Sequence, residues 1–262
     1  MSVACSAILA LYGGIATFGC DEDDQILLGL SRQEAIFIRI TYWSEEGGWW
    51  KSSLDEVKLL DLCYRRDPEK LFGLIEKTPN LEGLGLNYCP NLNDELFNTL
   101  PFEAVPKLQG ISMTESQVSE ECVEHLNKAK NLERLNVGWR VPPERYGVSE
   151  PSVFSDKFLE EMDLPKLKEL NIYSNCTITD EGLLSLLKLP CLTDIHLETQ
   201  ILTTQGVDLF CRRYIAESDR SLFSRYVIRE ESTLIQILPT ELLEERRDYY
   251  EDNSRLPWTL IE

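Results

Sequence analysis

The sequence predicts an α/β solenoid in which a curved sheet of parallel strands forms the inner side and helices form the outer side. The first observation is the segment 167–172, LKELNI, where the first, fourth and sixth residues are apolar. The second is that the same pattern returns 25 residues later in the segment 192–197, LTDIHL. The third is a helix signal between them, TDEGLLSLL. A repeat of this length, made of a short strand followed by a helix, is typical of a solenoid.

The same spacing of three apolar residues recurs upstream. The first apolar residues of successive units lie 24, 27, 24, 35 and 25 residues apart. A degenerate first strand at 35–40, AIFIRI, brings the expected total to about seven units in one right-handed arc. A divergent last strand is expected at 223–228. The four upstream sets are Val57, Leu60 and Leu62; Leu81, Leu84 and Leu86; Leu108, Ile111 and Met113; and Leu132, Leu135 and Val137.

Helix start signals lie between the predicted strands. Asn93, Ser119, Thr179 and Thr203 are residue types that cap helices. Each follows an apolar residue that stands ten or eleven residues after the first apolar residue of its unit. We expect these apolar residues to pack inward as the chain enters each helix. A charged helix at 240–247, after Pro239, is expected to close the C-terminal end of the stack.

We expect one domain over residues 1–262. It is divided into an N-terminal cap with the degenerate first repeat at 1–54, core repeats at 55–215 and a C-terminal cap at 216–262. The long gap of 35 residues contains three prolines between 138 and 155, which indicates a loop insertion of about ten residues. Trp49 and Trp50 are expected to cover the N-terminal end of the core. The alternative is that the loop tryptophans Trp43, Trp49 and Trp50 form a binding contact.

The charge balance narrows the class of partner. The chain has 26 basic and 45 acidic residues, with a formal net charge of −19. Such a charge repels phosphate backbones and anionic lipids, so we expect neither nucleic acid nor a membrane surface as a partner. A basic protein is the partner that this charge favours. The alternative is that the charge serves only solubility, and on its own the chain is expected to be a monomer.

The cysteines indicate a reducing compartment. No two of the eight form a C-x-x-C pair, so we expect reduced, mostly buried thiols rather than disulfides or a zinc site. The apolar first 20 residues carry no positive charge after Met1 and are interrupted by Gly13 and Gly14, which disfavours a signal peptide. We therefore expect a cytoplasmic protein. The cysteines are Cys5, Cys20, Cys63, Cys89, Cys122, Cys176, Cys191 and Cys211.

Two motifs carry a resemblance to a known family. Residues 84–89 have the pattern L-x-L-x-x-C, and residues 178–183 read ITDEGL with Leu186 following. This resembles the cysteine-containing and ribonuclease-inhibitor-like leucine-rich repeats, in which L-x-L-x-x-N/C precedes L-T-D-x-G-L-x-x-L. Asn175 fits the equivalent turn of another unit. The resemblance covers roughly residues 55–215. It implies a curved parallel sheet with helices outside and a protein-binding role, but it implies no particular partner.

Candidate binding residues lie between the apolar anchors of the strands. Side chains alternate along a strand, so these residues face away from the core. The middle strands place glycine and small polar residues there, whereas the last two place charged and aromatic ones, which can receive Lys or Arg side chains. The alternative is a solvated polar face. With the tryptophan that follows one strand, the candidates are Asp61, Arg134, Trp139, Glu169, Tyr173, Asp194, His196 and Glu198.

The sequence offers little support for catalysis. His196 with Asp194 is the only candidate for a histidine–carboxylate pair, and a polar strand face explains both residues without chemistry. Gly-rich phosphate-binding motifs are absent. The acidic run at 21–24 lacks the ligand spacing of a calcium loop. We therefore predict no catalytic residue, no metal and no cofactor.

These observations favour a non-enzymatic protein-binding module. The most specific hypothesis is an acidic inhibitor or immunity-type protein that binds a basic partner, such as a nuclease toxin, through its concave face. One alternative is a substrate-recognition adaptor of a ubiquitin-ligase-like complex, although no F-box-like helical segment is evident in residues 1–54. The other alternative is an enzyme whose site lies in the insertion at 139–155 or in the C-terminal segment.

Overall fold

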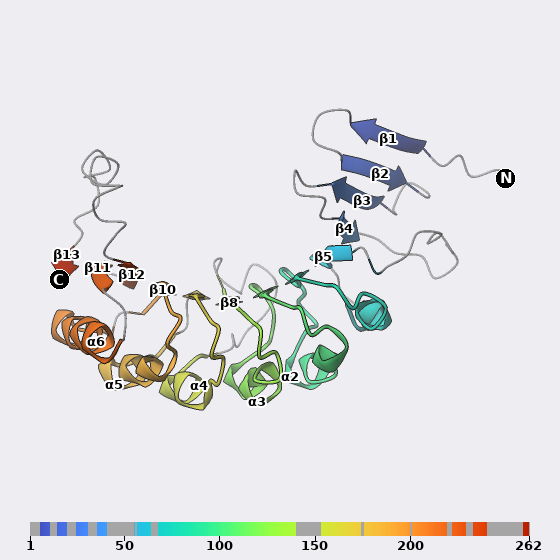
Figure 1. Ribbon diagram of the computed structural model, residues 1–262. Coiled ribbons are helices and arrows are strands. Elements are labelled where there is room, and N and C mark those ends of the chain that lie inside the picture. Colours follow the sequence, from blue (N-terminus) through green and yellow to red (C-terminus); the bar gives the residue numbers. More distant parts are fainter. Residues whose placement is uncertain are drawn as a thin grey trace.

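The computed structural model describes residues 6–10, 15–19, 25–30, 36–40, 55, 57–63, 68–139, 153–173, 176–199, 201–218, 222–228, 233–239 and 259–261. Within these ranges the strands form one sheet of 13 strands. Helices α2 to α6 follow one another along one side of the middle of this sheet (Figure 1). The fold is therefore of the α/β class, with a mostly parallel central sheet.

Seven strands in the middle of the sheet are parallel and follow the order of the chain. Their register places the middle anchors of the units, from Leu60 to Ile195, in one row. The residues of this row are at most 3% exposed, because they face the helices. The predicted parallel pairing of the core strands is confirmed. The strands are β4 (Ile36–Ile40), β5 (Val57–Asp61), β6 (Gly83–Gly85), β7 (Gly110–Ser112), β8 (Arg134–Gly138), β9 (Glu169–Tyr173) and β10 (Asp194–Leu197).

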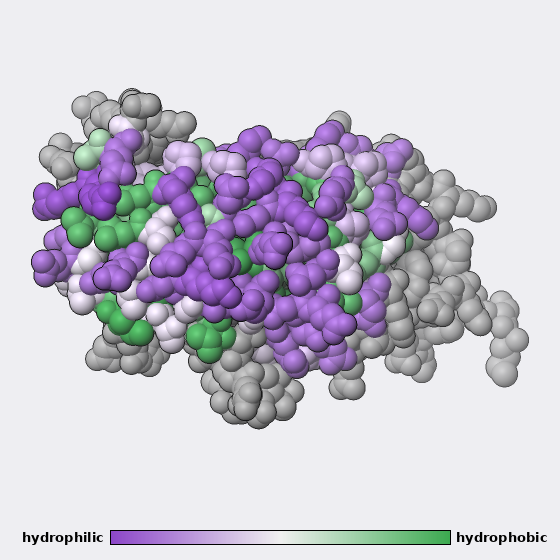
Figure 2. Space-filling view, turned by 90° about the horizontal axis from the view of Figure 1, so that it is seen from below, coloured by the Kyte–Doolittle hydropathy of each residue, from purple (hydrophilic) through white to green (hydrophobic). Residues whose placement is uncertain are grey.

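Most of the described helices are only one or two turns long. Helices this short are marginal alone in water, so packing against the sheet must hold them. Figure 2 views the molecule from the helical side and shows a largely hydrophilic surface there. The helices are η2 (Pro68–Leu71), α1 (Phe72–Ile75), α2 (Asp94–Phe97), η3 (Phe102–Ala104), η4 (Glu120–Cys122), α3 (Val123–Leu126), α4 (Asp156–Glu161), α5 (Asp180–Leu184), η6 (Ser185–Lys188) and α6 (Thr204–Glu217).

The predicted helix caps are confirmed. Asn93, Ser119, Thr179 and Thr203 all have extended backbones, and each side chain accepts a hydrogen bond from a backbone N–H of its helix. The apolar residue before each cap is buried, as the spacing predicts. The caps therefore mark where each unit turns from the sheet into its helix.

A ladder of carboxylates links these caps from unit to unit. The backbone N–H and the hydroxyl of Ser119 both donate to Asp94, the first helical residue of the preceding unit, at 2.8 and 2.6 Å. Thr179 donates in the same way to Asp156, and Thr203 donates to Asp180. Each carboxylate in this "carboxylate ladder" thus satisfies a neighbour's cap while it lies at its own helix N-terminus, where negative charge is favourable.

The N-terminal end of the sheet differs from the core. Strands β1 (Ser6–Ala10), β2 (Ile15–Gly19) and β3 (Gln25–Leu30) pair antiparallel, and β3 pairs antiparallel with β4. The predicted N-terminal cap therefore contains an antiparallel meander that the sequence pattern did not predict. The predicted strand at 36–40 is confirmed. The acidic run at 21–24 and the three nearby tryptophans lie outside the described residues.

The C-terminal end is also antiparallel. The predicted strand at 223–228 exists as β11 (Leu222–Ile228), but it does not continue the parallel series. Strand β12 (Thr233–Pro239) pairs antiparallel with both β10 and β11, and β13 (Thr259–Ile261) pairs antiparallel with β11. Only residues 229–232 join β11 to β12, and so short a connection permits only an antiparallel hairpin. The predicted helix at 240–247 lies outside the described residues.

The described cysteines are free thiols. Cys89, Cys122, Cys176 and Cys211 are buried in the core, and the other two described cysteines are half-buried, as predicted. Cys5 and Cys20 lie outside the described residues. In the part of the chain that the structure describes, no helix has both the length and the apolar character needed to cross a bilayer.

Candidate functional site

The side of the parallel sheet that faces away from the helices carries the predicted site. Along β6, β7, β9 and β10 the anchors are buried, and most residues between them are only half-buried, as side-chain alternation requires. We call this surface the open face. Its residues are Leu59, Asp61, Cys63, Gly83, Gly85, Asn87, Gly110, Ser112, Thr114, Arg134, Asn136, Gly138, Glu169, Asn171, Tyr173, Asp194, His196 and Glu198.

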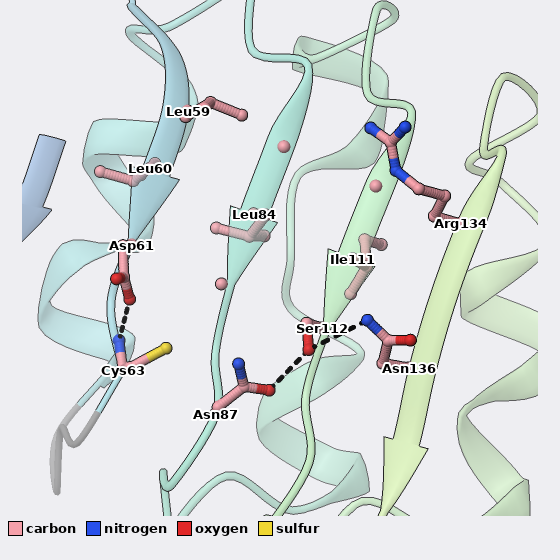
Figure 3. Close-up of a pocket in the computed structure, with 13 residues that line it drawn as sticks. Leu59, Leu60, Asp61, Cys63, Leu84, Asn87, Ile111, Ser112, Arg134 and Asn136 are labelled. Carbon is pink, nitrogen blue, oxygen red and sulfur yellow. Dashed lines mark hydrogen bonds between the residues drawn. The ribbon is translucent and has the colours of Figure 1, made fainter. Parts of the chain in front are cut away.

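A cavity of about 280 Å³ lies on the open face over β5 to β8 (Figure 3). The open-face positions of β6 and the first of β7 are glycines, Gly83, Gly85 and Gly110, so the floor of this groove is low. The Leu59 side chain covers Gly83, with its Cδ2 atom 2.5 Å from the position that a Cβ there would occupy. Larger side chains rise on both sides. The lining residues are Leu59, Leu60, Asp61, Cys63, Gly83, Leu84, Gly85, Asn87, Gly110, Ile111, Ser112, Arg134 and Asn136.

A row of hydrogen-bonded polar side chains crosses the carboxyl end of the groove. Asn87 Oδ1 accepts from the Ser112 hydroxyl at 2.7 Å and from the Thr114 backbone N–H at 2.9 Å. Asn136 Nδ2 donates to Ser112 Oγ at 3.4 Å, and Asn171 Nδ2 donates to Asn136 Oδ1 at 2.6 Å. A backbone N–H can only donate, so the Thr114 bond fixes the orientation of the Asn87 amide.

Arg134 lies at the opposite end of the groove, at the start of β8. Its register neighbours are Gly110 on β7 and Glu169 on β9. The guanidinium lies over β7, where its Nε and Nη2 atoms are 3.6 Å from the position that a Cβ on Gly110 would occupy. Among the described residues no ion pair joins Arg134 to Glu169.

Asp61 and Cys63 form the β5 wall of the groove. Asp61 is only 8% exposed, and its Oδ1 accepts the Cys63 backbone N–H at 3.0 Å. Burial raises the pKa of the Cys63 thiol well above its usual value, and the nearby Asp61 carboxylate raises it further. The thiol is therefore protonated at neutral pH and is a poor nucleophile.

The acidic and aromatic candidates gather on β9 and β10. Glu169 and Asp194 are register partners. The Tyr173 ring meets the His196 ring edge-on at a centroid distance of 5.2 Å, and His196 Nε2 lies 3.9 Å from Glu198 Oε1. We call these five residues the acidic cluster. The structure thus brings together the five residues that the sequence pattern placed on neighbouring strands, although Tyr173 is 8% exposed and offers little of its ring.

Trp139 does not belong to this surface. It was predicted as a contact residue because it directly follows an open-face strand, but its side chain is 1% exposed. Gly138 has φ of +89°, and the Trp139 N–H then donates to the Tyr173 carbonyl at 2.9 Å. This turn at the end of β8 places the indole in the interior rather than in solvent. Residues 140–152 of the insertion lie outside the described residues.

The groove is the part of the site that the sequence did not predict. The glycines at open-face positions indicated a surface with few projecting side chains, but they did not predict a cavity. Arg134 and Asp61, two of the candidates, line this groove and not the acidic cluster. In the described part of the chain no group of three or more His, Cys, Asp or Glu side chains is placed to hold a metal ion.

No protein-family model matches the chain, and a search of curated proteins returns no match.

Proposed function

We propose that the chain is a leucine-rich repeat protein of the cysteine-containing, ribonuclease-inhibitor-like type, and that it is a non-enzymatic module that binds a basic protein. The repeat type is supported by one parallel strand per unit, by anchors in a common register, and by caps that recur at the same place in each unit. The function within this class is that of an acidic inhibitor or immunity-type protein.

The observation that carries this proposal is the acidic cluster. Three carboxylates lie close together on one face: Glu169 on β9, Asp194 on the adjacent β10, and Glu198 directly after β10. Adjacent strands are about 4.8 Å apart, so one partner segment can meet all three. Their side chains are half-buried on a sheet, which holds them in place before binding and limits the ordering that binding requires.

The charge of the whole chain acts in the same direction. A formal net charge of −19 attracts a basic protein over long distances and speeds its association. The glycine-floored groove beside the cluster adds little relief, so a convex partner surface can approach both strands. The cluster then supplies the local contacts and the net charge supplies the steering.

The test compares three versions of the chain as baits in a lysate of the cells that express it. The binding-face variant carries Glu169→Lys, Asp194→Lys and Glu198→Lys. The control variant carries Glu76→Lys, Glu124→Lys and Glu160→Lys, three exposed residues on the helical side, and so has the same net charge. A recovered partner is then purified and titrated into each version by calorimetry.

We expect a basic partner whose affinity falls by about 3 kcal/mol with the binding-face variant and by less than about 1 kcal/mol with the control variant. Affinity for the unmodified chain should also fall steeply as salt is raised, mainly through a slower association rate. An equal loss of affinity in both variants would mean that the net charge of the chain, and not the acidic cluster, determines binding. An acidic partner, or unchanged affinity for the binding-face variant, would contradict the proposal.

A further inference from the structure

We infer that the groove over β5 to β8 binds the C-terminal end of an extended peptide, with Arg134 as the anchor for the terminal carboxylate. This site is separate from the acidic cluster, and it does not depend on the proposed function. It rests on three features of the groove: a guanidinium without a hydrogen-bond or ion-pair partner among the described residues, a second set of free donors, and a low floor of glycines.

The first feature is the position of Arg134. The guanidinium lies over Gly110 at the edge of the cavity and not beside Glu169, its register neighbour on β9. Among the described residues it has neither a hydrogen bond nor an ion pair. No other open-face residue from β5 to β10 is a lysine or an arginine. A guanidinium in this state presents paired N–H donors, which match a carboxylate.

The second feature is Asn87 at the other end of the groove. Its Oδ1 is occupied by Ser112 and Thr114, which turns its Nδ2 away from them (Figure 3). Within the described ranges no acceptor meets the Nδ2 hydrogens. The groove therefore presents donors at both ends, and a ligand that satisfies both must carry acceptors at both ends.

The distance between these donors selects a peptide over a small anion. Gly110 and Thr114 are four residues apart along one strand direction, and Asn87 lies beside Thr114. With a rise of about 3.3 Å per residue, the two ends of the groove are roughly 13 Å apart at the backbone. Three or four extended residues span this length, so the terminal carboxylate can meet Arg134 while a backbone carbonyl accepts from Asn87.

The third feature is the glycine floor. Gly83, Gly85 and Gly110 have no side chains, although the Leu59 side chain lies over Gly83. A peptide backbone can therefore approach the sheet most closely over Gly85 and Gly110, between the two walls. The cavity of about 280 Å³ suits the last few residues of a chain with small side chains. Asp61 on the β5 wall disfavours a second carboxylate, so the ligand class is a peptide with one terminal carboxylate and neutral or basic side chains.

The probe is N-acetyl-tetraalanine with a free C-terminal carboxylate, and its control is the same peptide with a C-terminal amide. Binding is followed by chemical-shift changes in the ¹⁵N-labelled chain. We expect the acid to shift resonances of groove residues and to bind at least tenfold more tightly than the amide. Arg134→Gln should lower the affinity for the acid at least tenfold, whereas Arg212→Gln, an exposed arginine on α6, should leave it unchanged.

The Gly110→Val variant tests whether the open groove is needed for binding, because it leaves the charge of Arg134 in place. A Cβ at this position makes only ordinary contacts, and valine suits a strand, so the variant should fold with an unchanged Tm. It should nevertheless lose peptide affinity at least tenfold, because its side chain enters the groove and meets the Arg134 guanidinium that lies over this position. The Glu169→Lys, Asp194→Lys, Glu198→Lys variant should keep or increase peptide affinity, so this site can be judged even if the proposed function fails.

Four outcomes would overturn the inference. They are no binding of the acid up to its solubility limit, equal binding of acid and amide, unchanged affinity in Arg134→Gln, and displacement of the peptide by acetate at a concentration equal to that of the peptide. The last outcome would mean that the groove binds only a carboxylate group, and the inference that it binds a peptide would be wrong.

Discussion

At the scale of single residues, His125 shows how burial controls a titratable group. Its ring is buried between Phe97 and Phe102, at centroid distances of 5.9 and 5.0 Å, and its Nε2 lies 2.8 Å from the Leu100 carbonyl. Burial lowers the pKa of His125 below its ordinary value of 6.5, and Lys128 lowers it further, while the Leu100 carbonyl and Glu103 act in the opposite direction. The folded chain therefore keeps this ring neutral.

This lowered pKa predicts a loss of stability in mild acid. Below pH 6.5 the histidine of the unfolded chain takes up a proton before the buried ring does, so unfolding becomes more favourable as the pH falls. Above pH 6.5 the contribution is fully present. His125→Gln keeps an N–H donor for the Leu100 carbonyl but does not titrate in this range. Thermal melts between pH 7.5 and 5.5 should therefore show a smaller decrease in Tm for the variant. Equal decreases in the two proteins would contradict the assignment to His125.

Trp139 and Arg134 show where inference from single residues fails. Strand alternation correctly places Arg134 on the open face, and it places Trp139 directly after the last open-face residue of β8. The direction of each side chain was nevertheless set by a neighbour in space, by the Gly138 turn against β9 for Trp139 and by the empty position over Gly110 for Arg134. Trp139 is thus buried in the interior, and Arg134 lies over the groove.

At the scale of elements, the carboxylate ladder explains a glycine in two of the helices. Gly182 and Gly206 each stand three residues after a cap and pack against an aspartate of the preceding unit. A Cβ on Gly182 would lie 1.9 Å from Asp156 Oδ1, and one on Gly206 would lie 2.0 Å from Asp180 Cγ. The glycine in the ITDEGL motif is therefore needed for contact between units and not for the helix itself.

We predict that Gly182→Ala destabilises the fold by about 1–3 kcal/mol, because the added methyl displaces the Asp156 carboxylate from the Thr179 cap. Gly206→Ala should act similarly through Asp180. The matched control is Gly73→Ala, which adds a methyl to an exposed position of α1 with nothing within 4 Å. It should stabilise by up to about 1 kcal/mol through helix propensity alone. Urea unfolding measures all three, and stabilisation by Gly182→Ala would contradict the packing argument.

At the scale of the whole molecule, net charge and sheet continuity oppose each other. One sheet runs through all 13 described strands, so each unit is held by its neighbours. The formal net charge of −19 repels itself in the compact state. Ion pairs between units, such as Lys157 with Glu121 at 2.7 Å and Lys130 with Asp163 at 2.6 Å, are exposed and offset only part of this repulsion.

Added salt should therefore stabilise the chain. Raising NaCl from about 0.02 to about 0.2 M shortens the screening length from about 20 to about 7 Å and weakens the repulsion. We expect Tm to rise by about 2–4 °C, which corresponds to roughly 1 kcal/mol in a chain of this size. The variant with Glu76, Glu124 and Glu160 changed to lysine has a net charge of −13 and should show a smaller rise. A decrease of Tm with salt would mean that the exposed ion pairs outweigh the repulsion.

The sequence by itself determined the parallel core, the caps and the rows of open-face residues. Apolar anchors at a constant spacing specify a strand that is buried on one face, and cap residues at a constant offset specify where each helix begins. These are local patterns, so the acidic cluster on β9 and β10 could be read from the sequence. Only the tertiary structure decided the antiparallel ends, the burial of Trp139, the groove and the direction of Arg134. Each of these depends on contacts between segments far apart in the chain, and the sequence pattern within one unit does not specify such contacts.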